Sequence, residues 1–261
     1  MSSGMKILKL IAKLKFLIPN IFTLLSIYFA YLAFLSDDVV DRCWFVLLCV
    51  IMDKLDGTSA RLLRATTKFG LKFDSVADAI AFGVLPGLII FQGASLVPES
   101  MANSMAWIYL FKFSGVVYIL ATFWRLYKFD KLAASDSSPL CFFGIPSTLA
   151  AAIFAAYCVA FGPYFEAQIG LVFLLPLWGL VLSVLMNGNF PTLKVGIPEK
   201  KSLRLLQALG FIYLGIAIPT RQTAPGLFIL AVLVLFITIY YGRRNFKRRD
   251  QEEPAKEING A

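Results

Sequence analysis

The chain has 261 residues, of which 59% are hydrophobic and 16% are charged. Soluble domains carry about 25% charged residues, so this composition excludes an ordinary soluble globule and indicates a membrane protein with several spans. The chain contains no histidine, which excludes histidine as a general acid or base and as a metal ligand. The net charge of +9 comes mostly from basic residues beside apolar segments, so the expected partner is anionic membrane lipid rather than nucleic acid.

The first predicted element is a surface segment over residues 1–18. Between Met5 and Phe16, lysines and apolar side chains occupy opposite faces of a helix, as is typical of a short amphipathic helix on a membrane interface. A transmembrane catalytic domain is expected over residues 19–242. A cytoplasmic tail over residues 243–261 follows, basic at first and expected to be disordered beyond Arg249.

Eight apolar stretches within the transmembrane domain predict an all-α, polytopic fold. The division of residues 145–186 is open, because Gly162, Pro163 and Pro176 interrupt it. The expected spans cover approximately residues 20–35, 42–61, 75–94, 105–127, 145–161, 168–186, 203–219 and 224–242.

The positions of lysine and arginine predict the orientation. With both termini in the cytoplasm, 21 of the 25 basic residues fall in cytoplasmic segments, and the external loops contain only Arg42 and Arg221. Because positive residues are retained on the cytoplasmic side, we expect a multi-pass protein of the cell membrane with an even number of spans.

Four aspartates lie at the expected cytoplasmic ends of the second and third spans. Asp53 and Asp56 are three residues apart and Asp74 and Asp78 are four apart, so each pair shares a helical face. The short basic loop between the two spans makes them neighbours, which allows the four carboxylates to converge. Such a cluster repels itself unless cations neutralise it, and Mg²⁺ and Mn²⁺ prefer all-oxygen sites. Two such ions can clamp a diphosphate and stabilise the attacking and leaving oxygens.

Small and basic residues frame these aspartates. Gly57, Ala60 and Gly70 leave room for a nucleotide, and Arg61 offers a planar donor for a phosphate oxygen. A single aspartate–arginine pair at a helix end is usually a solvated salt bridge. Four carboxylates in this setting instead favour a metal and phosphate site.

The stretch over residues 53–78, DKLDGTSARLLRATTKFGLKFDSVAD, fits the pattern D-x2-D-G-x2-A-R-x8-G-x3-D-x3-D without a mismatch. This pattern resembles the signature of the CDP-alcohol phosphatidyltransferase family. The resemblance implies transfer of a phosphatidyl group from a CDP-linked lipid to an alcohol, with release of CMP. It also implies that Asp53, Asp56 and Asp74 bind two Mg²⁺ or Mn²⁺ ions, and that Asp78 binds metal and acts as the base for the acceptor hydroxyl.

The same resemblance implies where the CDP-lipid binds. Gly57, Ala60 and Arg61 match positions that contact the CDP moiety, and the segment Pro19-Asn20-x-x-Thr23 looks like a family element near the nucleotide. The expected CDP-lipid site therefore consists of Asn20, Thr23, Asp56, Gly57, Ala60, Arg61 and Gly70.

Four runs resemble the membrane-embedded phosphatidylserine synthases of this family: DSVADAIAFGVLPG (74–87), FWRLYKFD (123–130), GIPS (144–147) and NFPTLK (189–194). They imply CDP-diacylglycerol as the donor and L-serine as the acceptor, and the family suggests a homodimer.

A cation is needed for the carboxylate of serine, so we expect Arg125 and Lys128 to line the acceptor site. We expect Asp130 there as well, because it belongs to the FWRLYKFD run. Arg125 is equally typical of a topology signal, and the lysine is more typical of a topology signal than of an acceptor site. Asp130 stands where the resembling proteins usually have Asn, and Tyr127 stands where they usually have Ala.

Three alternatives remain open. The same fold could use glycerol phosphate, inositol phosphate or choline as the acceptor, or an ether lipid as the donor. An ion-coupled transporter could use the aspartates as its pathway, although such sites are expected near the membrane midplane with repeat symmetry. A structural scaffold would leave the carboxylate cluster unexplained.

Overall fold

The computed structural model describes residues 3–63, 67–97, 105–134, 141–193, 209–210, 212–217 and 224–259. Helices dominate this part of the chain. They are α1 (Ser3–Leu35), α2 (Val39–Leu63), α3 (Lys68–Asp78), α4 (Leu85–Gln92), α6 (Met105–Ala134), α7 (Ser147–Phe161), α8 (Ile169–Asn187) and α10 (Ala224–Asn259). Shorter elements are the π-helix η1 (Ala79–Val84), the 3₁₀-helices η2 (Gly93–Leu96) and η3 (Gly162–Tyr164), and the strands β1 (Cys141–Phe143) and β2 (Pro191–Leu193).

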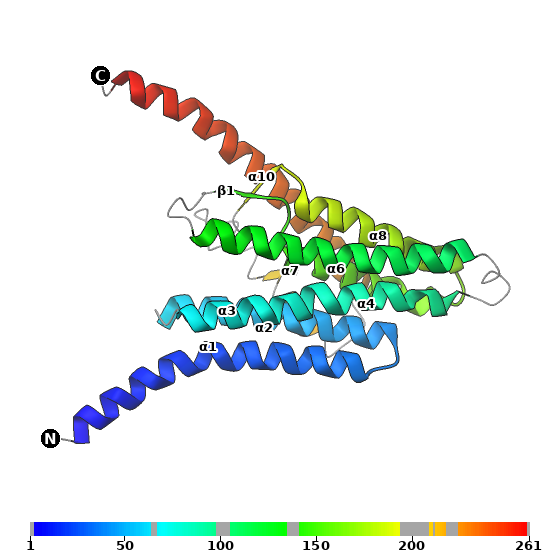
Figure 1. Cartoon of the computed structure of the whole chain (residues 1–261), viewed down its shortest axis with the longest axis horizontal. Helices are drawn as coiled ribbons and strands as arrows, with labels where there is room; N and C mark the ends of the chain where they lie inside the picture. The colour runs from blue at the N-terminus through cyan, green and yellow to red at the C-terminus, as the bar shows by residue number, and fades with distance from the viewer. Residues whose placement is uncertain are drawn as a thin grey trace.

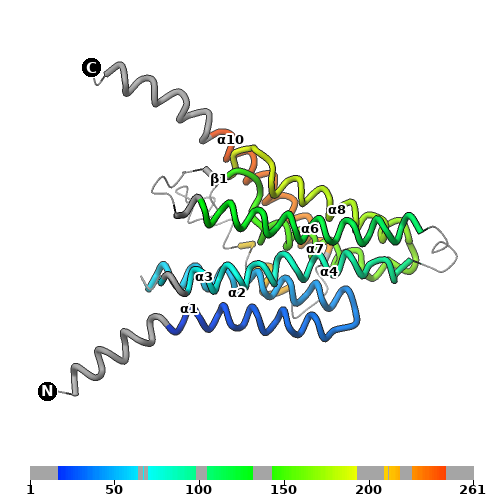
Figure 2. Tube along the Cα trace, in the orientation of Figure 1, coloured from blue at the N-terminus to red at the C-terminus, as the bar shows by residue number. Residues whose placement is uncertain are grey.

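The helices lie side by side in an elongated bundle (Figure 1). The path can be followed in Figure 2, where α1 and α2 turn back on each other and α3, η1 and α4 continue alongside them. Both chain ends lie at the same end of the bundle as the C-terminus of α2, the N-terminus of α3 and strand β1 (Figure 1). We call this the terminal end of the bundle.

Six helical segments are long and apolar enough to cross a membrane, among the residues that the structure describes. These segments are Leu17–Leu35, Gly70–Leu96, Met105–Lys131, Ser147–Tyr164, Ile169–Asn187 and Pro225–Arg244. They confirm the expectation of an all-α, polytopic membrane protein. Helix α2 adds 25 residues, which is enough to cross a bilayer, but it carries several charged side chains. Of the expected span at 203–219, residues 209–210 and 212–217 are helical and the others lie outside the described residues.

Two boundaries differ from those expected. The N-terminal segment and the first span form one helix, because α1 continues through Pro19; prolines are tolerated in transmembrane helices where neighbouring groups satisfy the freed backbone. Helix α10 extends to Asn259 and so includes part of the tail. Its Gln, Glu, Ala and Lys residues have high helix propensity, which favours this continuation.

The two-stranded ribbon was not expected. Strands β1 and β2 pair antiparallel, with Cys141 opposite Leu193 and Phe143 opposite Pro191. Strands of three residues, separated in sequence by two transmembrane helices, leave no periodic signal in the sequence. The ribbon ties the segment before α7 to the segment after α8.

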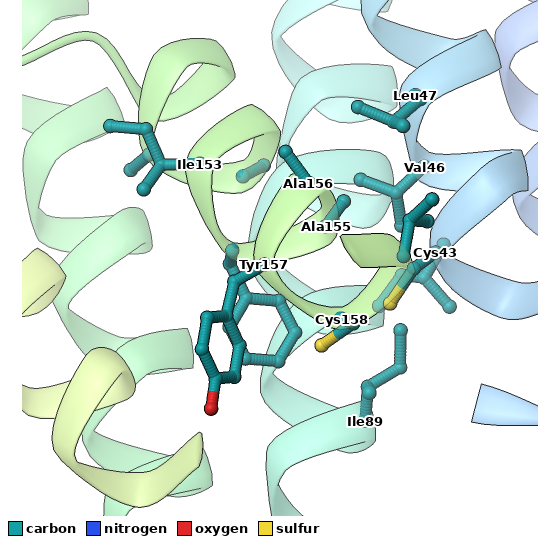
Figure 3. Close-up of a cluster of buried hydrophobic side chains, with 14 of the residues drawn as sticks. Cys43, Val46, Leu47, Ile89, Ile153, Ala155, Ala156, Tyr157 and Cys158 are labelled. Carbon is teal, nitrogen blue, oxygen red and sulfur yellow. The ribbon is translucent and has the colours of Figure 1, made fainter. Parts of the chain in front are cut away.

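Helix α7 occupies the centre of the bundle, and most of its side chains are buried. In Figure 3, Ala155, Ala156 and Cys158 of α7 lie close to Val46 and Cys43 of α2. Association of helices in lipid depends on close packing rather than on the hydrophobic effect, and small residues permit it. The alanine-rich sequence of α7 therefore explains its central position.

Glycines set the distance between α4 and α6. A Cβ atom built on Gly87 would lie 2.9 Å from the carbonyl oxygen of Gly115 and would overlap the side chain of Ile119. The backbones of the two helices therefore approach directly. This contact fixes α6 alongside the helix that carries Asp74 and Asp78, with which it runs antiparallel.

Candidate active site

Three carboxylates converge near the terminal end of the bundle. Asp53 comes from α2, and Asp74 and Asp78 come from successive turns of α3. One carboxylate oxygen from each lies within 4.8 Å of those of the other two, and all three side chains are half-buried. A divalent cation such as Mg²⁺ or Mn²⁺ takes oxygen ligands in this arrangement, so these residues fit a metal site. Without a cation the three carboxylates would repel one another.

The fourth aspartate lies beside this group rather than in it. Asp56 is 7% exposed and accepts a hydrogen bond from the hydroxyl of Thr23 on α1. Its charge still acts on Asp53, Asp74 and Asp78. The structure therefore gathers all four aspartates. Three of them could bind one metal ion together, and Asp56 faces α1.

The residues expected to bind the CDP-lipid come together in pairs. A Cβ atom on Gly70 would lie 3.5 Å from Oδ1 of Asn20, so α3 and α1 approach closely here. A Cβ atom on Gly57 would lie 3.9 Å from Nη2 of Arg61, which places the guanidinium beside that glycine. Ala60 is half-buried on the same helix, one position before Arg61.

The start of α3 is fixed by a capping residue that sequence inspection did not identify. Thr67 precedes the helix with an extended backbone, and its hydroxyl accepts a hydrogen bond of 2.9 Å from the backbone N–H of Gly70. Such caps satisfy the free donors of a first helical turn. The cap sets the helix start two turns before Asp74.

Of the three residues expected to bind the acceptor, Arg125 is the one whose charge acts on Asp78. It interacts electrostatically with Asp78, and its Nη1 donates to the hydroxyl of Ser147 at 3.5 Å. Lys128 instead lies over the ring of Trp124, with 5.7 Å from Nζ to the ring centroid, and Trp124 is 56% exposed. Lys128 therefore points toward the outer surface of α6.

Asp130 is exposed and accepts a weak hydrogen bond of 3.4 Å from the hydroxyl of Ser75. Ser75 lies between Asp74 and Asp78 in sequence. The end of α6 is thus held against the helix that carries the metal-site candidates.

The two later runs with family resemblance meet beside Arg125. Gly144 of the first run donates its backbone N–H to the carbonyl of Phe190 at 3.0 Å, and Thr192 donates its hydroxyl to the carbonyl of Gly144 at 2.7 Å. Gly144 has a φ of +74°, which favours glycine, and a Cβ atom there would overlap the carbonyl of Met186. Ser147, at the start of α7, is the residue of this loop that contacts Arg125.

Asn187, the last residue of α8, was not singled out in the sequence. Its side-chain amide donates to the carbonyl of Ala121 at 3.0 Å and to that of Ser183 at 3.3 Å. The sequence signal was weak: a polar residue ending an apolar helix, two positions before the NFPTLK run.

A family model described as CDP-alcohol phosphatidyltransferase matches residues 16–185. The chain belongs to the CDP-alcohol phosphatidyltransferase family. The chain is thus a member of a phosphotransferase family, which excludes the transporter and scaffold alternatives. The match includes the four aspartates, Arg125 and Ser147, and it ends before Asn187 and β2.

Curated relatives give the family context. A Helicobacter pylori protein named CDP-diacylglycerol–serine O-phosphatidyltransferase is 35% identical over 190 residues, which cover 69% of this chain and 75% of the relative. A protein of the same name from another Helicobacter pylori strain is 38% identical over 149 residues, or 55% of this chain and 57% of the relative. An archaetidylserine synthase from Methanothermobacter thermautotrophicus is 26% identical over 174 residues, or 65% of this chain and 66% of the relative.

CDP-alcohol phosphatidyltransferases generally depend on divalent metal ions. The group formed by Asp53, Asp74 and Asp78 is able to hold such an ion by its chemistry and its spacing. The family membership and the carboxylate geometry therefore agree.

Proposed function

We propose that this protein is a phosphatidylserine synthase, which transfers the phosphatidyl group of CDP-diacylglycerol to L-serine and releases CMP. The observation that carries the proposal is the convergence of Asp53, Asp74 and Asp78 from two helices within the family signature. The names of the Helicobacter pylori relatives support serine as the acceptor. The archaeal relative is named for the same headgroup, so an ether-lipid donor remains the alternative on the donor side.

The metal site in this proposal consists of Asp53, Asp74 and Asp78, with Asp56 completing it when ligands are bound. One or two Mg²⁺ or Mn²⁺ ions there would supply positive charge against the diphosphate of the donor. Asn20 and Gly70, and Gly57, Ala60 and Arg61, would surround the cytidine and its phosphates. Thr23 would orient Asp56 through their hydrogen bond.

The protein's own residues then account for the transfer step. Asp78 accepts the proton of the serine hydroxyl, and the hydroxyl oxygen forms a bond to the lipid-side phosphorus. The bond from that phosphorus to the bridging diphosphate oxygen breaks, and CMP leaves with the electron pair. Arg125, whose charge acts on Asp78, would hold the carboxylate of the incoming amino acid.

The test is CMP release by the purified protein from CDP-diacylglycerol with L-serine, glycerol 3-phosphate, inositol phosphate, choline or no acceptor. We expect release with L-serine, abolition by EDTA and recovery with Mn²⁺ or Mg²⁺. Release with another acceptor in place of serine would refute the serine assignment alone. No release with any acceptor in the presence of metal would refute the proposed function as a whole.

Acceptors that carry a phosphate would need more positive charge at the site. Lys128, the second expected cation, lies on Trp124 rather than beside Asp78. This placement favours an acceptor with a single carboxylate over one with a phosphate.

We also propose that the terminal end of the bundle faces the cytoplasm, where serine is available, and that the protein forms a homodimer in the cell membrane. The distribution of basic residues supports this orientation. Labelling of single cysteines placed in the tail and in the link between α1 and α2 would test it, since only the latter should react with an impermeant reagent from outside. The mass of the detergent-purified protein would test the dimer.

A further inference from the structure

Asn187 has a fixed orientation at the junction of α6 and α8. Both hydrogen bonds of its amide nitrogen go to carbonyl oxygens, those of Ala121 and Ser183. A carbonyl oxygen cannot donate, so the network itself assigns Nδ2 to that side and Oδ1 to the other. Because Ala121 lies one helical turn before Arg125, this amide sits at nearly the same level of α6 as the arginine.

Two polar atoms at this level are buried without a partner in the described part of the chain. One is an acceptor, Oδ1 of Asn187, and the other is a donor, Nε of Arg125. Buried polar groups are nearly always hydrogen-bonded, so each unsatisfied group needs an explanation. Arg125 also interacts with Asp78, the candidate base. A ligand with one donor group and one acceptor group would satisfy both the free acceptor of Asn187 and the free donor of Arg125.

We propose that Asn187 is a specificity-determining residue that binds the α-ammonium group of the acceptor amino acid through Oδ1, while Arg125 binds the carboxylate. This inference rests on the proposed function and extends it to a residue that lies beyond the family match. The ammonium group needs an oxygen acceptor other than the aspartates, whose oxygens face the metal site. Ser147 contacts the same guanidinium at Nη1 and so helps to orient it.

The arrangement also predicts that the site selects one enantiomer of serine. Serine carries its carboxylate, ammonium and hydroxymethyl groups on one carbon atom. Arg125, Asn187 and Asp78 would each hold one of these three groups. Three fixed contacts accept one enantiomer only, so the loss of the Asn187 contact should lower the preference for L-serine over D-serine.

The experiment compares acceptors in the full-length, detergent-purified protein. The acceptors are L-serine, D-serine and 3-hydroxypropionate, which is serine without its amino group. For the wild type we expect efficient CMP release with L-serine only. Asn187→Ala should raise KM for L-serine at least tenfold and lower the ratio of kcat/KM for L-serine over 3-hydroxypropionate at least tenfold, with KM for CDP-diacylglycerol unchanged.

The matched control is Ser183→Ala on the same helix. The hydroxyl of Ser183 donates to the carbonyl of Gly179, and its backbone carbonyl still accepts from Asn187 after the substitution. This variant should keep both acceptor ratios. A purely structural role for Asn187 would lower turnover with every acceptor equally and leave the ratios unchanged, which would overturn the inference.

Two further outcomes are decisive. If Asn187→Ala does not fold, the wild-type panel still applies, since equal use of 3-hydroxypropionate and L-serine would show that the ammonium group is not recognised. If the wild type releases no CMP with L-serine, the proposed function itself fails. If the wild type uses L-serine and Asn187→Ala keeps the wild-type ratios, only the inference about Asn187 fails.

Discussion

The substitution Asp78→Asn should separate catalysis from stability. In the protein without metal, the carboxylate of Asp78 lies within 4.8 Å of those of Asp53 and Asp74. At this distance and an effective dielectric constant of about 20, two unit charges repel by about 3 kcal/mol, an upper value because protonation and counter-ions relieve part of it. Even about 1 kcal/mol of relieved repulsion would raise Tm by roughly 2–4 °C for a protein of this size.

Turnover should change in the opposite direction. If Asp78 accepts the proton of the acceptor hydroxyl, its amide variant should lose about 10²–10⁴-fold in kcat, the usual contribution of a positioned general base. The neighbouring Asp56, Asn20 and Arg61 are untouched by this substitution, so binding of CDP-diacylglycerol should be largely retained. The predicted signature is therefore a more stable apoprotein that binds its donor and turns over slowly.

The assays are thermal unfolding in detergent with EDTA, CDP-diacylglycerol binding with Mn²⁺, and CMP release. Asp37→Asn is the matched control, since Asp37 is exposed and lies in the link at the opposite end of α2; it should change neither Tm nor turnover. Wild-type turnover in Asp78→Asn would refute its role as the base. An unchanged or lower apoprotein Tm would refute the inference that unneutralised repulsion is stored in the cluster.

Two further substitutions test how the site is held. Thr23→Val removes the hydroxyl that donates to Asp56, and a hydrogen bond to a charged group contributes about 1.5–3 kcal/mol. This variant should raise KM for CDP-diacylglycerol and leave KM for serine unchanged. The control Thr238→Val removes a hydrogen bond within its own helix and should change neither KM. Gly87→Val places a side chain against the backbone of Gly115 and should destabilise the protein by about 1–3 kcal/mol through overpacking, measured as a lower Tm. Gly170→Ala faces open space and serves as its control; an equal loss of stability in both glycine variants would contradict the close approach of α4 and α6.

Much of the fold followed from sequence because each transmembrane helix is encoded by a continuous apolar stretch. The pairing of Asp53 and Asp56 on one face was also sound within a single helix. What spacing cannot supply is the rotation of that helix relative to its neighbours. Three residues span about 300° at about 100° per residue, which leaves the two side chains about 60° apart. This offset is enough for Asp53 to face α3 while Asp56 faces Thr23 on α1.

The features that sequence inspection missed depend on contacts between distant segments. Asn187 has a defined orientation only when α8 lies against α6 and its amide reaches the carbonyl of Ala121. The ribbon depends on pairing between residues about fifty positions apart. The sequence predicts an acceptor site with both Lys128 and Arg125, because both are basic and close in sequence. Three residues along α6 are nevertheless enough to turn Lys128 toward Trp124.

The π-helix η1 bears on how this part of the chain can vary in length. In a regular α-helix, the nine residues from Asp78 to Gly87 would cover two and a half turns and place the two on opposite faces. Six π-helical residues, with hydrogen bonds to i+5, absorb about one extra residue and reduce the angle between Asp78 and Gly87. A related chain that lacks one residue within 79–84 could reach the same alignment with a plain α-helix. An alignment of relatives should therefore show a single-residue gap within 79–84 more readily than elsewhere in this helix. Asp78 before this segment is needed for the chemistry, and Gly87 after it is needed for the close approach of α6.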